Sequence, residues 1–209
     1  GLGLPLKRLP FPLLLSVAAM VAYGAVYVTS AAGPARTGLA SKHLLWASMG
    51  ACAFLAVYAI DFRRYLDWSP FFFAAGLLAL GLVLFTAPVK GARSWFNLGF
   101  MKAQPSEFMK LVYLLMLTRY LASTPEPMRF RHLLGALGIM LVPVGMILLQ
   151  PDLGTAMTFM PVVVVGVFVA GARLWHLGIL GATGLSGAVL MWLRIMREYQ
   201  KERIYAWLD

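Results

Sequence analysis

Long apolar runs dominate the chain, and their lengths predict helices that cross a membrane. A helix needs about 20 residues, with a range of roughly 17–25, to span the hydrocarbon core of a bilayer. Six runs meet this criterion and contain no Asp, Glu, Lys or Arg: 11–31, 44–60, 68–89, 133–149, 153–172 and 174–193. The last run is interrupted by His176, which we expect at the membrane interface rather than as a ligand.

A seventh segment, 105–122, is more polar, because it carries Glu107, Lys110 and Arg119. Glu107 and Lys110 are three residues apart, so they share a helix face and can form an ion pair. Arg119 can extend its charged end toward the far interface, and Pro105 suits the first position of a helix. We predict a seventh span here, with a polar interfacial helix as the alternative.

The number of spans decides which polar segments share one side of the membrane. With seven spans, the loop 31–43, the loop 90–104, the turn 150–152 and the tail from Arg194 lie on the same side. With six spans, the regions around residues 107 and 152 would lie on opposite sides.

The composition agrees with a membrane protein and excludes several other classes. Hydrophobic residues make up 61% of the 209 residues, charged residues make up 12%, and the mean hydropathy is +0.79. Soluble domains carry about 25% charged residues. The sequence therefore predicts an all-α polytopic membrane protein, not a disordered, collagen-like or disulfide-rich chain. The single cysteine, Cys52, excludes an internal disulfide, and we interpret it as a small packing residue.

The net charge of +10 does not decide the orientation of the spans. Of the 18 Lys and Arg residues, the seven-span arrangement places eight on the first side and nine on the second, with Lys110 inside the membrane. Cytoplasmic loops are normally the more basic ones. Cations retained on the second side suggest an anionic ligand such as a phosphate-bearing lipid. Contact with anionic membrane lipids is an equally open alternative, and no nucleic-acid partner is expected.

Three charged side chains near the second side are candidates for function: Glu107, Lys110 and Asp152. The stretches Gln-Pro-Ser-Glu (104–107) and Gln-Pro-Asp (150–152) each place a proline near a helix start and a carboxylate in its first turn. The helix dipole favours negative charge there, so a capping role for Asp152 and a structural Glu107–Lys110 pair are simple alternatives. The functional hypothesis is that all three face a cavity open to this side, since charge within spans is costly.

Two further segments add polar groups to the same side. The loop 90–104 holds Arg93, whose guanidinium suits bidentate contact with phosphate, although an interfacial loop anchored by its aromatic residues is the simpler interpretation. The tail 194–209 alternates cations with aliphatic and aromatic residues, which is typical of a basic amphipathic segment on a membrane surface. No metal-ligand spacing, phosphate-binding glycine loop or nucleophile elbow is present, so we predict no metal site within the chain.

Four stretches together resemble the SEDS family (shape, elongation, division and sporulation; RodA and FtsW). They are Gly-Ala-Arg-Ser-Trp-Phe-Asn-Leu-Gly (91–99), Gln-Pro-Ser-Glu-Phe-Met-Lys (104–110), Gln-Pro-Asp-Leu-Gly-Thr (150–155) and the tail from Tyr199 to Asp209. The tail is closer to the RodA branch, where it resembles the entry into a large extracellular loop. The resemblance covers nearly the whole chain.

The resemblance implies a peptidoglycan glycosyltransferase that polymerises the undecaprenyl-linked precursor lipid II for cell-wall elongation. It implies a class B penicillin-binding protein as partner and the bacterial cytoplasmic membrane as location. It further implies about ten spans, a cytoplasmic N-terminus and an active extracellular or periplasmic face, with the large loop after span seven. The cations of the second side would then meet the pyrophosphate of lipid II. No cofactor is implied with certainty, and a divalent cation is left open.

The family's functional residues carry over in part. Glu107 and Lys110 match its important pair in span four, Asp152 matches the acidic residue of its second signature, and Arg93 matches the arginine of its loop motif. The proposed catalytic aspartate lies farther along the large loop, in a His-Thr-Asp-Phe context, and Asp209 matches an earlier Leu-Asp instead. We therefore expect no catalytic residue within these 209 residues, an N-terminal portion that is inactive alone.

Two other functions remain as alternatives. A flippase or transporter for a lipid-linked precursor suits intramembrane charge pairs and interrupted helices. Against it, the polar groups cluster on one side and mark no path across the membrane. A non-catalytic scaffold for a penicillin-binding protein also suits a chain without the proposed base.

Overall fold

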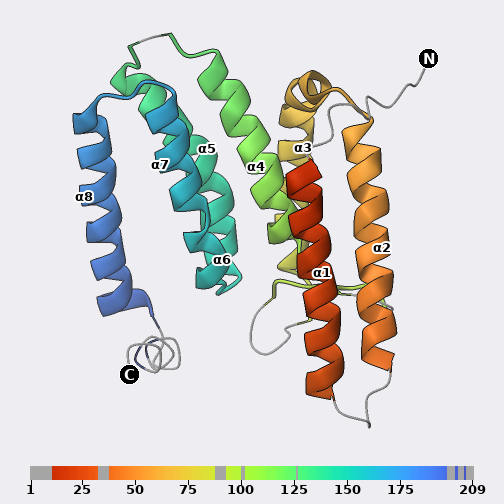
Figure 1. Cartoon of the computed structure of the whole chain (residues 1–209). Coiled ribbons are helices and arrows are strands. Elements are labelled where there is room, and N and C mark those ends of the chain that lie inside the picture. Colours follow the sequence, from red (N-terminus) through yellow and green to blue (C-terminus); the bar gives the residue numbers. More distant parts are fainter. Residues whose placement is uncertain are drawn as a thin grey trace. The chain divides into compact units, whose positions relative to one another are not determined.

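The structure is a computed structural model that describes residues 11–32, 38–87, 93–99, 102–125, 127–196, 201 and 205. Most of these residues are helical (Figure 1). The elements are α1 (Phe11–Ala32), α2 (Gly38–Tyr58), α3 (Phe62–Val83), β1 (Phe96–Asn97), β2 (Lys102–Ala103), α4 (Pro105–Ala122), α5 (Phe130–Leu149), α6 (Leu153–Met157), α7 (Phe159–Val169), α8 (Leu174–Leu190) and the π-helix η3 (Met191–Ile195). The chain divides into two compact units, Gly1–Arg64 and Tyr65–Asp209.

The first unit contains α1 and α2, which pack against each other. The ring of His43 on α2 lies 3.2 Å from the carbonyl oxygen of Val21 on α1, at its Nε2 atom. Most side chains of the two helices are exposed, as suits helices whose apolar surface faces lipid. Cys52 is exposed on α2, so its interpretation as a packing residue is wrong.

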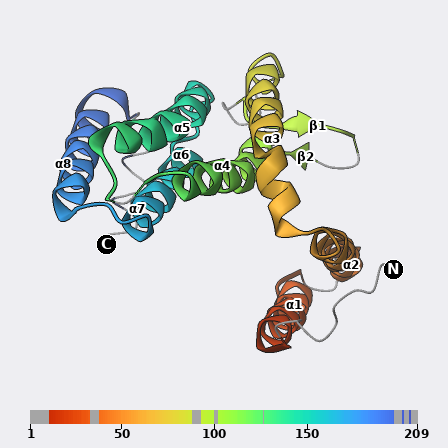
Figure 2. The same ribbon diagram turned by 90° about the horizontal axis from the view of Figure 1, so that it is seen from above.

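The core of the second unit lies between α4, α5 and α7 (Figure 2). Helix α4 presents Met109, Tyr113 and Leu117, all buried and spaced four residues apart along one face. Helix α7 presents a buried stripe with the same spacing, from Phe159 to Val167. The rings of Tyr113 and Phe159 meet at 5.1 Å between their centroids. This packing, rather than its weakly apolar composition, stabilises α4 within the bundle.

The predicted helix over 105–122 is confirmed, since α4 has the same bounds and Pro105 in its first turn. By length and composition alone, four helices of the described chain can cross a membrane: Phe11–Ser30, Phe62–Val83, Phe130–Leu149 and Leu174–Arg194. Helix α4 is not among them, because it carries three charged residues. The all-α membrane class is therefore confirmed, and the count of seven spans stays a prediction.

The predicted span 153–172 stays a prediction: its helical stretch ends at Val169 and is interrupted by a single residue, Thr158, between α6 and α7. Pro161 gives the physical reason for this interruption, since a proline lacks an amide donor and clashes with the carbonyl four residues earlier. Three other boundaries also differ from those predicted. Helix α2 begins before residue 44, α3 occupies residues 62–83 instead of 68–89, and α8 ends at Leu190. A charge-free window misplaces such ends, because charged residues such as Arg63 and Arg64 are part of the first turn of α3.

The basic tail 194–209 lies largely outside the described residues. Its described part includes Tyr205, whose ring meets that of Trp192 edge to face at 5.6 Å. The surface position predicted for this tail stays a prediction.

Candidate functional site

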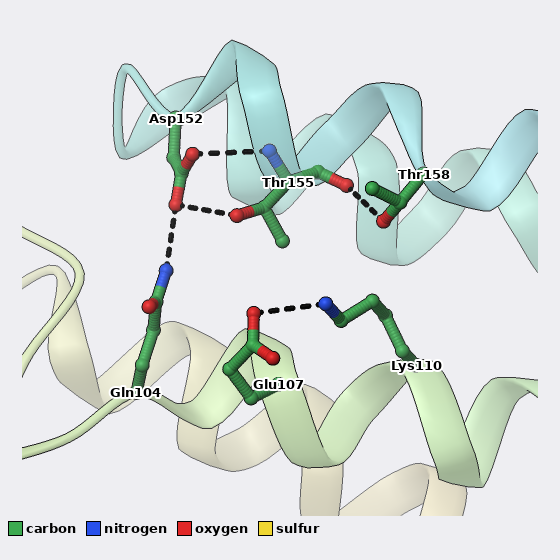
Figure 3. Close-up of polar contacts among 6 residues, drawn as sticks. All are labelled: Gln104, Glu107, Lys110, Asp152, Thr155 and Thr158. Atoms are coloured by element: carbon green, nitrogen blue, oxygen red, sulfur yellow. Dashed lines mark hydrogen bonds and ion pairs between the residues drawn. The ribbon is translucent and has the colours of Figure 1, made fainter. Parts of the chain in front are cut away.

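The two proline-containing motifs come together at one end of the second unit (Figure 3). Gln104 precedes α4 and Asp152 precedes α6. The Nε2 atom of Gln104 donates a hydrogen bond of 2.7 Å to Oδ2 of Asp152. A short bond to an ionised acceptor is among the stronger hydrogen bonds in proteins. It joins two segments that are 48 residues apart in sequence.

Asp152 also caps the N-terminus of α6. Its Oδ1 atom accepts a hydrogen bond from the backbone N–H of Thr155 at 3.1 Å, and its Oδ2 atom accepts one from the Thr155 hydroxyl at 2.9 Å. The predicted capping role is therefore confirmed. Together with Gln104, these donors satisfy the carboxylate inside the protein, in a part-buried position.

Glu107 and Lys110 form the predicted ion pair in the first turns of α4. The Lys110 Nζ atom lies 2.9 Å from Oε1 of Glu107, and the two side chains are 32% and 55% exposed, respectively. Figure 3 shows both on the side of α4 that is turned toward Asp152 and Thr155. The pair is thus accessible, and it is placed beside the carboxylate that links the two motifs.

The loop that carries Arg93 is tied to the same end of the unit. Strands β1 and β2 pair antiparallel, with Phe96 opposite Ala103, and β2 leads directly to Gln104. Gly99 has a φ of 82°, the left-handed conformation that glycine adopts readily in the turn between these strands. The Nη1 atom of Arg93 donates to the carbonyl of Leu84, just beyond α3, at 3.2 Å.

Two glutamines take structural roles that the sequence did not reveal. Gln104 links the two motifs, and Gln150 is fully buried. The Nε2 atom of Gln150 donates to the carbonyl of Leu80 on α3 at 3.2 Å, and its backbone carbonyl accepts from the Ser94 hydroxyl at 3.4 Å. The sequence signal that could have pointed to both glutamines is the Gln-Pro pair that occurs in both motifs. In each motif, a role was expected only for the proline and for the acidic residue that follows it.

The structure brings the candidate residues together only in part. Asp152 is bonded to Gln104, and Glu107 is paired with Lys110, but among the described residues no hydrogen bond or ion pair joins Arg93 to these acids. The cavity expected around them stays a prediction. Within the described part of the chain, no group of three or more His, Cys, Asp or Glu side chains is arranged to hold a metal ion.

His176 is buried within the protein, and its expected position at the level of the membrane interface stays a prediction. It is 1% exposed and lies at the opposite end of the unit from Asp152, in the first turn of α8 (Figure 1). Its ring packs against Trp175 at 4.0 Å between centroids and near Phe130 at 6.2 Å. A single histidine in an apolar run carries no sequence signal of such packing.

Residues 11–209 match the family FTSW_RODA_SPOVE, described as a cell cycle protein. The chain belongs to this family. The chain is 37% identical to the peptidoglycan glycosyltransferase RodA of Treponema pallidum over 76% of its own length and 38% of that protein. It is 34% identical to the stage V sporulation protein E of Bacillus subtilis over 81% and 47% of the two lengths. The resemblance carried by the four motif stretches is thereby confirmed.

Solved structures agree with this placement. The rod shape determining protein RodA of Thermus thermophilus matches with a TM-score of 0.70 and 34% identity, over 85% of this chain and 60% of that one. A second match is a structure titled "Structural coordination of polymerization and crosslinking by a peptidoglycan synthase complex". Its TM-score is 0.76 and its sequence identity is 35%, over 95% of this chain and 59% of that one. The chain spans about half the length of the curated relatives it matches.

Proposed function

We propose that the protein containing this chain is a peptidoglycan glycosyltransferase, and that this chain supplies part of its substrate site. The observation that carries the proposal is the Gln104–Asp152 hydrogen bond, which unites the two signature motifs and sets the Glu107–Lys110 pair beside them. Relatives of this chain are named peptidoglycan glycosyltransferases. The fold and family support the same reaction class.

The proposed substrate is lipid II, and the reaction is glycosyl transfer. The 4-hydroxyl oxygen of one lipid II attacks the anomeric carbon of a lipid-linked glycan. The bond from that carbon to the pyrophosphate oxygen breaks, and the lipid pyrophosphate leaves with the electron pair. A base takes the hydroxyl proton, and cations stabilise the leaving group. The family resemblance implies an aspartate in a His-Thr-Asp-Phe stretch as base, and residues 1–209 contain no such stretch.

Within this scheme, Arg93 and Lys110 stabilise the anion. The Lys110 ammonium is held by Glu107 yet remains 32% exposed, so it is oriented and still reachable by a phosphate oxygen. Arg93 is oriented by the Leu84 carbonyl through Nη1, and its guanidinium carries further donors. Asp152 shapes the site by joining α4 to α6, and Glu107 positions Lys110.

The protein is a multi-pass membrane protein, and we propose that this end of the bundle is the extracellular or periplasmic one. The pyrophosphate-linked substrate would then meet the cations of this side. A class B penicillin-binding protein is the proposed partner, supported by the match to a structure of a peptidoglycan synthase complex.

The test is polymerisation of labelled lipid II by the purified full-length protein with its partner. We expect Glu107→Ala and Lys110→Ala each to lower the rate about 100-fold, the scale for losing one electrostatic stabiliser of a transition state. Arg131→Gln, an exposed cation at the other end of the unit, is the charge-matched control and should keep the wild-type rate. Wild-type rates in both site variants would contradict the proposal. Lipid II translocation in liposomes without polymerisation would contradict it as well.

A further inference from the structure

A cavity with arginine and histidine side chains in its walls lies at the end of the unit opposite Asp152. Figure 1 shows that the α4–α5 and α7–α8 connections meet at this end. The cavity has a volume of about 370 Å³. Its walls combine prolines and aromatic rings with two arginines and a histidine: Pro125, Pro127, Met128, Arg129, Phe130, Arg173, Trp175 and His176. No step of the proposed glycosyl transfer uses these residues.

The two helices that begin at this cavity start with the same motif. Arg129 and His132 open α5, and Arg173 and His176 open α8, each pair three residues apart. In each pair the backbone N–H of the arginine faces Nδ1 of the histidine, at 3.4 Å in α5 and 3.3 Å in α8. The backbone N–H of the histidine donates back to the arginine carbonyl, at 2.9 Å in both. Both histidines therefore close the first turn of their helix.

In His176, whose Nε2 atom accepts no hydrogen bond, this contact indicates which ring nitrogen carries the proton. Because Nδ1 accepts from a backbone N–H, it has no hydrogen of its own, and the neutral ring carries its proton on Nε2. In His176, the Nε2–H group is buried and has no hydrogen-bond partner among the described residues. A buried donor without a partner costs about 1–3 kcal/mol, so the site calls for an acceptor.

The charges around His176 indicate which kind of acceptor fits. Arg129 and Arg173 line the same cavity, and each immediately precedes a helix N-terminus. Helix N-termini carry partial positive charge, so cations are unfavourable there and anions are favourable. Two guanidinium groups, two helix N-termini and one buried N–H donor together match the oxygen atoms of a phosphate group.

We propose that this cavity binds a phosphate group through Arg129, Arg173 and the Nε2–H of His176. The phosphate belongs either to the headgroup of an anionic phospholipid or to free inorganic phosphate. Phe130 and Trp175 in the cavity wall are residues of the kind enriched at the level of lipid headgroups. The site is independent of the proposed glycosyl transfer, because it lies at the other end of the bundle.

The experiment measures lipid binding by the purified protein in a neutral detergent, by native mass spectrometry. Phosphatidylglycerol is the anionic probe, and phosphatidylcholine, which has no net charge, is the reference. In a second arm, equilibrium dialysis with radiolabelled inorganic phosphate measures binding of the free ion. Retention of phosphatidylglycerol that excess phosphate does not displace assigns the site to the lipid. Displacement, or direct binding of the ion, assigns it to free phosphate.

Matched variants test which groups form the site. We expect Arg173→Gln to lower binding about tenfold, as for a lost charge-assisted hydrogen bond, and Arg131→Gln to leave it unchanged. Arg131 is in the same turn of α5 as the cavity residue Phe130, but it does not line the cavity. His176→Phe keeps an aromatic ring and removes Nε2–H. His132→Phe removes the equivalent first-turn contact from α5 without removing a cavity donor, so it should bind normally.

Three results would overturn the proposal. The first is equal retention of phosphatidylglycerol and phosphatidylcholine, with no binding of inorganic phosphate. The second is an equal loss of binding in Arg131→Gln and Arg173→Gln, which would indicate non-specific attraction. The third concerns Glu126, which lies outside the described residues and is a neighbour in sequence of Pro125 and Pro127. Phosphate binding only in a Glu126→Gln variant would show that the protein's own carboxylate fills the site.

Discussion

The two ends of the second unit use the same structural device with opposite charges. At one end, Asp152 and Glu107 lie at helix N-termini, where the helix dipole stabilises a carboxylate by about 0.3–1 kcal/mol. At the other end, Arg129 and Arg173 lie at helix N-termini, where the same dipole opposes them. The two carboxylates of the acidic end find their partners within the chain, in Gln104, Thr155 and Lys110. At the basic end the buried Nε2 of His176 has no partner among the described residues, and at the acidic end the same holds for the Ser106 hydroxyl and the side-chain oxygen of Gln150. The comparison therefore separates carboxylates whose partners lie within the chain from a histidine nitrogen whose partner does not.

The largest expected change in stability comes from removing the Asp152 carboxylate, which links the start of α4 to the start of α6. Asp152→Ala removes the α6 cap and leaves the Gln104 amide without its carboxylate, so we expect a loss of about 2–3 kcal/mol in the free energy of unfolding. Denaturant unfolding in detergent micelles, followed by circular dichroism, measures it. Asp67→Ala is the control, since that carboxylate is 75% exposed and lies 3.7 Å from Arg119. Equal losses in the two variants would show that the hydrogen bonds of Asp152 to Gln104 and Thr155 do not stabilise the fold.

A smaller effect tests the packing that holds the basic end together. A Cβ atom added to Gly135 on α5 would collide with the hydroxyl of Tyr120 on α4, whereas one added to Gly138 meets nothing within 4 Å. We expect Gly135→Ala to cost about 1–3 kcal/mol, as overpacking does. Gly138→Ala should be neutral or stabilise by up to about 1 kcal/mol, because alanine favours helix. Thermal unfolding of the two variants, compared with the wild type, measures both, and equal melting temperatures would contradict the contact.

The smallest expected change in stability belongs to the Glu107–Lys110 pair. Both side chains are substantially exposed, so Lys110→Gln should cost no more than about 0.5 kcal/mol. The same variant is expected to lose polymerisation, which would separate the role of the pair in function from its role in folding. Unfolding and lipid II polymerisation are measured on one preparation of the full-length protein. A large loss of stability would instead indicate a structural ion pair.

Local chemistry explains which features could be predicted from the sequence. The Glu107–Lys110 pair and the Asp152 cap depend on residues three apart on one helix, so their spacing alone predicts them. The helix over 105–122 was also predictable, from Pro105 at its start and the apolar residues that follow. The break at Thr158 was missed because a hydropathy count treats Pro161 as one more apolar residue, whereas its backbone cannot continue the hydrogen-bond ladder.

The contacts that define each end depend on residues far apart in sequence. Gln104 meets Asp152 across 48 residues, and Gln150 meets the Leu80 carbonyl across 70. The cavity around His176 likewise combines the residues before α5 with those before α8. No local pattern encodes such pairings, because they follow from how the helices pack.

The sequence by itself determined the helical membrane class, the family and the residues with unusual chemistry, since apolar run length and motif spacing are local properties. Only the tertiary structure decided how those residues are used. Packing of α4 against α5 and α7 brings one carboxylate to an amide that satisfies it. At the other end, the same pair of an arginine and a histidine three residues later begins two helices with different results. His176 in the first turn of α8 is buried, whereas His132 in the first turn of α5 is only half-buried. Burial makes the difference, because a polar group removed from water must find its partner inside the protein or in a ligand.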